Sequence, residues 1–175
     1  EVVSNDLSVD RIQEIVEQIS NATSFTDSIL GIPAVYLAIV NNHDVSDELI
    51  KKMLLNIIDN FDTNTDDLTI AKIADSASKA LFDRMWGEEN KFGKWLMLWR
   101  SKHANSNQLE QFWNVVIKNP KRGTSPQFLK SLKRDFFKHP NVPSKIINRQ
   151  LKNLDSVAVI ASNPSISGKA LEAAI

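Results

Sequence analysis

The sequence predicts an all-α fold built from short helices that recur along the chain. The first observation is a repeated turn phrase, seen in HPNVPSKII at 139–147 and in SNPSISGKAL at 162–171. The second is apolar spacing of helical period between the turns. The third is the lack of strand signals, because no stretch alternates apolar and polar residues and no Asn-Gly or Asp-Gly pair marks a hairpin.

The turn phrase occurs seven times and reads as a helix end, a tight turn and a new helix start. After an apolar helix tail comes a residue that tolerates the left-handed position beyond a helix, usually asparagine. Proline follows in three copies, since it cannot continue a helix. A serine or threonine then accepts a hydrogen bond from the first amides of the next helix. The predicted caps are Ser8, Ser46, Thr65, Ser106, Ser125 and Ser167.

The first two predicted helices each carry an apolar stripe at i, i+3, i+4 and i+7, which places the stripe on one face. The first stripe consists of Ile12, Ile15, Val16 and Ile19. The second stripe consists of Leu49, Ile50, Met53, Leu54 and Ile57.

The later helices are shorter or less regular. Residues 69–100 are expected to contain two helices separated at Gly87. Residues 109–117 continue the apolar pattern to i+8, and two short helices follow at roughly 144–152 and 155–162. Helices this short cannot each bury a face alone, so we expect them to stack side by side.

The C-terminal modules resemble the leucine-rich repeat variant and the wider HEAT-like group of helical repeats. The residues that carry the resemblance are HPNVPSKIINRQLKNLDSVAVIASNPSISGKALEAAI. The likeness covers 119–175 well and 42–68 loosely. It implies one domain over residues 1–175, in which short antiparallel helices stack as a superhelical array. It also implies binding along one face and no chemistry.

Charge divides the chain into two halves although the net charge is zero. Residues 1–87 carry 15 acidic and 6 basic side chains, and residues 88–175 carry 6 acidic and 15 basic ones. Between Lys91 and Lys152, 14 cations face only Glu110 and Asp135. Such asymmetry indicates a charged partner.

Ten cations in successive modules are expected to form a positive face. These predicted partner-binding residues are Lys118, Lys121, Arg122, Lys130, Lys133, Arg134, Lys138, Lys145, Arg149 and Lys152. We predict a non-catalytic scaffold that binds a partner protein through this basic face. The alternative is a DNA or RNA binder without sequence preference, which would use the same cations for phosphate contacts.

The aromatic residues and histidines are interpreted as structural. Trp86, Trp95, Trp99 and Trp113 are expected to form one aromatic core that joins the two halves of the chain, and the alternative is one tryptophan exposed as a platform for a ligand or a stacked base. The histidines His43, His103 and His139 fall in three different turns without an H-E-x-x-H spacing, so no metal site is predicted.

Catalysis has little support in the sequence, and we predict that the protein is not an enzyme and holds no cofactor. Cysteine is absent, and no glycine-rich phosphate loop occurs. The pairs Asp66-Asp67 and Glu88-Glu89 are adjacent, so on a helix they point about 100° apart and cannot enclose a substrate.

The expected location is the cytoplasm, with no membrane association. No run reaches the roughly 18 apolar residues of a membrane span. The opening EVVSNDLSVD has neither an initiator methionine nor a signal segment, which indicates a processed product or a fragment of a longer chain. The apolar end LEAAI lacks a polar cap, so we expect further repeats or self-association beyond Ile175.

Overall fold

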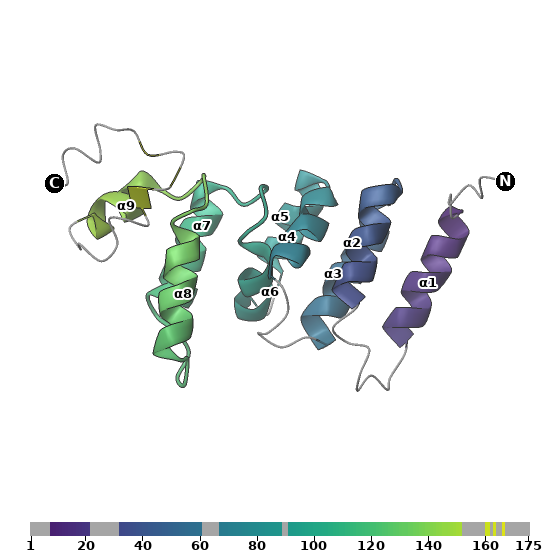
Figure 1. The fold of residues 1–175 in the computed structure, drawn as a ribbon, viewed down its shortest axis with the longest axis horizontal. Coiled ribbons are helices and arrows are strands. Elements are labelled where there is room, and N and C mark those ends of the chain that lie inside the picture. Colours follow the sequence, from purple (N-terminus) through teal and green to yellow (C-terminus); the bar gives the residue numbers. More distant parts are fainter. Residues whose placement is uncertain are drawn as a thin grey trace. The chain divides into compact units, whose positions relative to one another are not determined.

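Every regular element in the described residues is a helix, which confirms the all-α prediction (Figure 1). The computed structural model describes residues 8–21, 32–60, 67–88, 91–151, 160, 161, 163 and 166. The chain groups into two compact units, Glu1–His103 and Ala104–Ile175, called unit 1 and unit 2.

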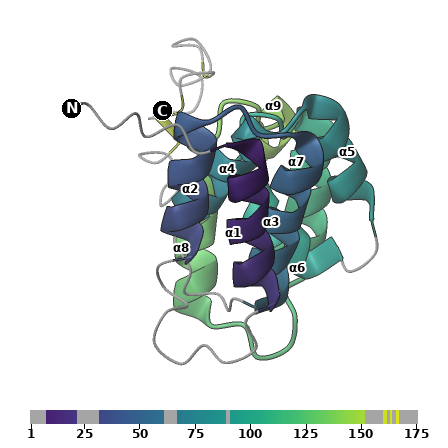
Figure 2. The same ribbon diagram turned by 90° about the vertical axis from the view of Figure 1, so that its right-hand side faces the viewer.

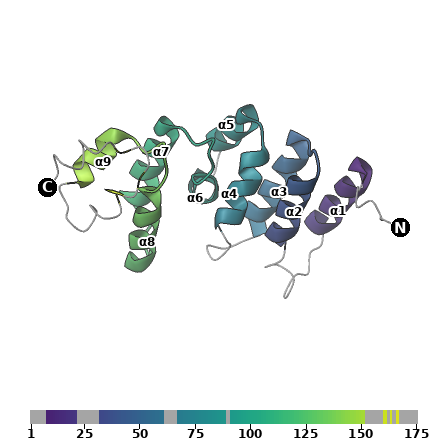
Figure 3. The same ribbon diagram turned by 45° about the horizontal axis from the view of Figure 1, so that its top comes forward.

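Unit 1 is built from helices that pack on their second neighbours in the chain. They are α1 (Val9–Asn21), α2 (Ile32–Asn42), α3 (Asp47–Asn60), α4 (Asp67–Ser76), α5 (Lys79–Gly87) and α6 (Lys91–Leu98). Helix α1 packs on α3, α2 on α4, and α4 on α6. Figure 2 shows α2 and α4 on one side and α1 and α3 beside them, and Figure 3 shows α1 to α4 following one another in chain order. Unit 1 therefore has two helical layers.

The predicted apolar stripes form the core of unit 1. Ile12, Val16 and the five stripe residues of α3 are buried, whereas Ile15 and Ile19 are half-buried. The break at Gly87 is confirmed, since α5 ends there and α6 begins at Lys91. The prediction of two helices over 69–100 is wrong, because a second break at 77–78, where Ser78 caps α5, separates α4 from α5 and gives three helices.

The tryptophans of unit 1 lie in its core, as the structural interpretation predicted. Trp86, Trp95 and Trp99 are all buried. The rings of Trp86 and Trp95 stack with centroids 5.3 Å apart, and the Trp95 indole N–H donates to the Trp86 carbonyl at 3.0 Å. A buried indole whose N–H finds a carbonyl is satisfied inside the fold.

Unit 2 begins with α7 (Ser106–Phe112), which continues as a π-helical segment, η2 (Trp113–Ile117). A loop at 118–125 leads to α8 (Pro126–Phe136), and α9 (Ser144–Gln150) follows. The loop turns at Gly123, whose φ of +92° favours glycine. Figures 1 and 3 show α9 beside α7 and α8. The predicted helix at 144–152 is present as α9, and most of the one at 155–162 lies outside the described residues.

An aromatic cluster forms the core of unit 2. The ring of Phe136 lies 5.3 Å from Trp113, 5.7 Å from Phe137 and 6.0 Å from Phe112, measured between centroids. All four side chains are buried, which extends the core interpretation to the fourth tryptophan. Such ring pairs stabilise a core beyond the area they bury.

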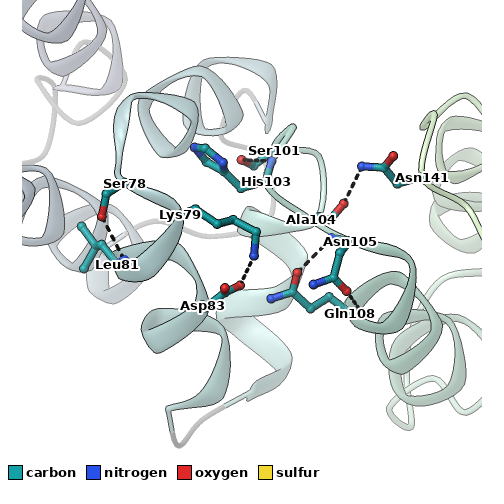
Figure 4. Close-up of polar contacts among 10 residues, drawn as sticks. All are labelled: Ser78, Lys79, Leu81, Asp83, Ser101, His103, Ala104, Asn105, Gln108 and Asn141. Carbon is teal, nitrogen blue, oxygen red and sulfur yellow. Dashed lines mark hydrogen bonds and ion pairs between the residues drawn. The ribbon is translucent and has the colours of Figure 1, made fainter.

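Three of the predicted helix caps are confirmed. The hydroxyls of Ser8, Ser46 and Ser125 accept hydrogen bonds from amides at the starts of α1, α3 and α8. Thr65 and Ser167 lie outside the described residues. The sequence also contains a cap that pattern reading missed, since the Ser78 hydroxyl accepts from the Leu81 amide (Figure 4).

The predicted cap at Ser106 is wrong by one residue. The side-chain oxygen of Asn105 accepts from the Gln108 amide at 3.0 Å, and the Gln108 side chain accepts from the Asn105 amide at 2.9 Å (Figure 4). This reciprocal capping box starts α7 directly after Asn105. Ser106 is then free to act elsewhere, and its hydroxyl donates to the Asn141 carbonyl.

Polar side chains tie the turns of unit 1 to one another. The Asp47 carboxylate accepts from the Ser78 amide at 2.8 Å and from the Ser78 hydroxyl. Asp75 accepts from the Ser101 hydroxyl at 2.6 Å and from the Lys102 amide at 2.8 Å. Each bond joins residues 26 to 31 positions apart in sequence. The start of α3 is thereby bonded to the start of α5, and the end of α4 to the turn after α6.

Asparagines make the corresponding ties in unit 2. The Asn141 side chain donates to the Ala104 carbonyl at 2.9 Å (Figure 4). The buried Asn163 side chain donates to the carbonyls of Phe137 and His139. These asparagines therefore act through their side-chain amides, a role that the turn phrase did not predict.

Acid should lower the stability of unit 1, because the hydrogen bonds of Asp47 and the ion pair of Glu88 depend on ionised carboxylates. The Ser78 hydroxyl and amide hold the pKa of Asp47 below its ordinary value of 3.8, and Lys94 holds the pKa of Glu88 below 4.5. A lowered folded-state pKa contributes stability that is present above the unfolded-state value and is lost as pH falls through the folded one. We expect Asp47→Asn to cost about 1 kcal/mol at neutral pH. That cost should shrink as pH falls below about 4.

Urea unfolding of Asp47→Asn at a series of pH values measures this dependence. Asp44→Asn, which changes an exposed carboxylate in the same turn, is the matched control. A difference between wild type and Asp47→Asn that stays constant down to about pH 2.5 would contradict the prediction.

Candidate functional site

The predicted basic residues are exposed wherever the structure describes them. Nine of the ten are described, and all nine are exposed; Lys152 lies outside the described residues. They belong to unit 2, which carries 11 Lys and Arg against 4 Asp and Glu. The excess of positive charge is therefore on the surface, where it is available to a partner.

One group of cations follows the loop at 118–125 and α8. The loop before α8 carries Lys118, Lys121 and Arg122. Helix α8 itself carries Lys130, Lys133 and Arg134, and the residue two positions after its end is Lys138. The helix buries Leu132 and Phe136, so residues on its opposite side face solvent. We call these seven residues the α8 group.

A single carboxylate offsets the charge at the C-terminal end of the α8 group. Asp135 lies 3.1 Å from the Lys138 ammonium and 3.6 Å from the Arg134 guanidinium. Exposed pairs of this kind are weak, since water and salt screen them. The α8 group thus remains strongly positive.

The other two cations, Lys145 and Arg149, lie on α9 and face α7 and η2. Lys145 forms an ion pair with Glu110 of α7. Both cations line a small surface pocket, which we call the α9 pocket, with a volume of about 50 Å³. Its lining residues are Glu110, Trp113, Asn114, Lys145, Ile146, Arg149 and Gln150.

The α9 pocket contains residues that the sequence pattern did not single out as binding residues. In the sequence, Glu110 stands out only as one of two acids within the basic stretch. No motif marks Asn114 or Gln150. Their proximity depends on how α9 packs against η2, and no local spacing encodes that contact. The i, i+4 relation of Lys145 and Arg149 on one helix face was the available signal.

His103 and His139 each make a structural contact within their own unit. The His103 ring lies 5.6 Å from the Phe82 ring in unit 1, and the His139 Nδ1 in unit 2 accepts from the Asn141 amide at 3.2 Å. Within the described parts of the chain, no group of three His, Asp or Glu side chains could hold a metal ion.

The fold and the site define an all-α protein with a cation-rich exposed surface on its second unit. In the described ranges no helix combines the length and apolar character needed to cross a membrane. Comparison with models of known protein families, with curated proteins and with solved structures finds no significant match. The features that bear on function are therefore the charge, burial and contacts of the described residues.

Proposed function

We propose that this protein is a non-catalytic, HEAT-like helical-repeat scaffold that binds an acidic partner protein through the exposed cations of unit 2. The observation that carries the proposal is the exposure of all nine described cations, of which three pair with the carboxylates Asp135 and Glu110. Charge of one sign on a surface raises the association rate with a partner of opposite sign and selects against like-charged ones.

The turn ties support the repeat part of the proposal. The helix pairs α3–α4, α5–α6 and α7–α8 each begin directly after a side-chain cap, at Ser46, Ser78 and Asn105. Side chains then link the turn before one pair to the turn before the next. Ser125 caps α8, the second helix of its pair, so the turn phrase occurs within pairs as well as between them.

The alternating contacts in unit 1 support it as well. Helix α1 packs on α3 and α2 on α4, as in a stack where the first helices of successive pairs form one layer and the second helices another. Such stacks offer an extended surface to partners, which suits recognition without chemistry.

A protein partner is favoured over nucleic acid by the placement of the tryptophans. All four are buried, so none offers a face on which a base could stack. Nucleic-acid binding through the α8 group is the alternative outcome of the test.

Fluorescence anisotropy with defined probes tests the proposal. One probe is an acidic peptide of about 16 residues with interspersed leucines, about the length that could span two helices. A second probe replaces its Asp and Glu by Asn and Gln, and a third is a single-stranded DNA of about 20 nucleotides. We expect micromolar binding of the acidic peptide and at least tenfold weaker binding of its neutral counterpart, an effect of about 1.4 kcal/mol.

Two outcomes would overturn the proposal. Failure of the acidic peptide to bind at about 50 mM salt would remove the basic surface as a recognition site. Tighter binding of DNA that falls steeply between about 50 and 200 mM salt would assign the surface to nucleic acid instead.

A further inference from the structure

The α9 pocket has an apolar floor and a polar rim. Trp113 and Ile146 are each 7% exposed, whereas Asn114 and Arg149 are exposed. Its volume of about 50 Å³ exceeds the share of one liquid water molecule. It is thus large enough for a group of the size of a carboxylate oxygen.

The charges at the rim leave one cation available. Glu110 is neutralised by its ion pair with Lys145. No ion pair involves Arg149 among the described residues, and its side chain is exposed. The amides of Asn114 and Gln150 complete a rim that can donate hydrogen bonds.

The π-helical segment shapes one wall of the pocket. The Lys118 amide donates to the Trp113 carbonyl at 2.8 Å, a bond that spans five residues and widens the turn. Single π turns occur preferentially at functional sites. Val115, the residue after Asn114, is 44% exposed and offers an apolar contact on the same segment.

From this geometry we propose that the α9 pocket receives an Asp or Glu side chain of the acidic partner, with Arg149 as the anchoring residue. The proposal rests on the proposed function and names the point of contact within it. An arginine fork binds a carboxylate through two parallel hydrogen bonds, which gives orientation as well as attraction. Arginine beside a buried aromatic residue is also a typical energetic centre of a protein interface.

A carboxylate fits the pocket better than a backbone phosphate does. Trp113 is only 7% exposed, so a nucleotide at the pocket would find no aromatic face on which its base could stack. A protein side chain brings a single carboxylate together with neighbouring methylene groups that can contact Ile146 in the lining of the pocket.

Calorimetric titration of Arg149→Gln with the acidic peptide is the direct test, and Lys130→Gln is the matched control. Both changes remove one exposed positive charge from a helix of unit 2. We expect Arg149→Gln to weaken binding by about tenfold, as for an interface anchor. Lys130→Gln should weaken it by about twofold, as for a screened surface charge.

Asn114→Asp provides a second variant that leaves Arg149 in place. The new carboxylate would occupy the fork itself and should weaken peptide binding by about tenfold as well. Circular dichroism and the thermal midpoint check that each variant remains folded. Equal affinities for Arg149→Gln and Lys130→Gln would overturn the pocket while leaving the basic surface in place, whereas failure of the wild type to bind the peptide removes both.

Discussion

Phe136→Ala is expected to lower the free energy of unfolding by about 3–5 kcal/mol, the largest effect of any single change proposed for this protein. Phe136 is 0% exposed and contacts the rings of Phe112, Trp113 and Phe137. Truncation removes the buried ring and leaves a cavity that neighbouring aromatic side chains are too rigid to fill. Urea unfolding followed by circular dichroism measures the loss.

Two further substitutions control for size and position. Phe136→Leu keeps most of the volume and should cost about 1–2 kcal/mol. Phe128→Ala truncates a phenylalanine of the same helix that is only half-buried, so its cost should be clearly smaller than that of Phe136→Ala. Equal losses for Phe136→Ala and Phe128→Ala would show that the cluster does not hold unit 2 together.

Asn163→Ala is expected to lower the free energy of unfolding by about 2 kcal/mol, because it removes two hydrogen bonds. Asn163 is 3% exposed, and its side-chain amide donates to the carbonyls of Phe137 and His139. Without it, the Phe137 carbonyl loses the Asn163 amide, whereas the His139 carbonyl still accepts from the Val142 amide at 3.3 Å. Losing a hydrogen bond to a buried carbonyl is costly. Thermal and urea unfolding measure the change.

Asn141→Ala is the matched control within the same unit. Asn141 makes a similar tie to the Ala104 carbonyl but is exposed, so water can replace its bond and the cost should be about 1 kcal/mol or less. If Asn163→Ala unfolds with wild-type stability, its two hydrogen bonds do not hold the turns of unit 2 together.

Neither Phe136→Ala nor Asn163→Ala changes a cation of the proposed binding surface. At temperatures where a variant remains folded, its affinity for the acidic peptide should therefore match that of the wild type. This separates the two roles assigned to unit 2, a core that maintains the fold and a surface that binds.

Local sequence was sufficient for the all-α class and for the starts of α1, α3 and α8. Ser8, Ser46 and Ser125 could be identified as caps because a cap bonds amides only two or three residues away. The stripes at 12–19 and 49–57 predicted buried faces for the same reason, since helical period relates residues within two turns. The exposure of the basic residues also followed from their charge.

Long-range contacts explain what the sequence did not reveal. The cap of α7 lies at Asn105 and not at Ser106, because the Gln108 side chain closes the capping box on it. Lys145 and Arg149 were predicted only as members of a positive face, and their place at a pocket with η2 had no sequence signal. The π turn at Trp113–Ile117 has no sequence signal of its own.

By itself the sequence determined that this protein is all-α, where α1, α3 and α8 begin, and that positive charge gathers on the surface of the second unit. Only the tertiary structure decided which turns bond to which, and that Arg149 lines one pocket with Trp113 and Ile146. The physical reason is the separation along the sequence of the residues that interact. Caps and helical period act over a few residues, whereas the ties at Asp47, Asn141 and Asn163 join residues 24 to 37 positions apart.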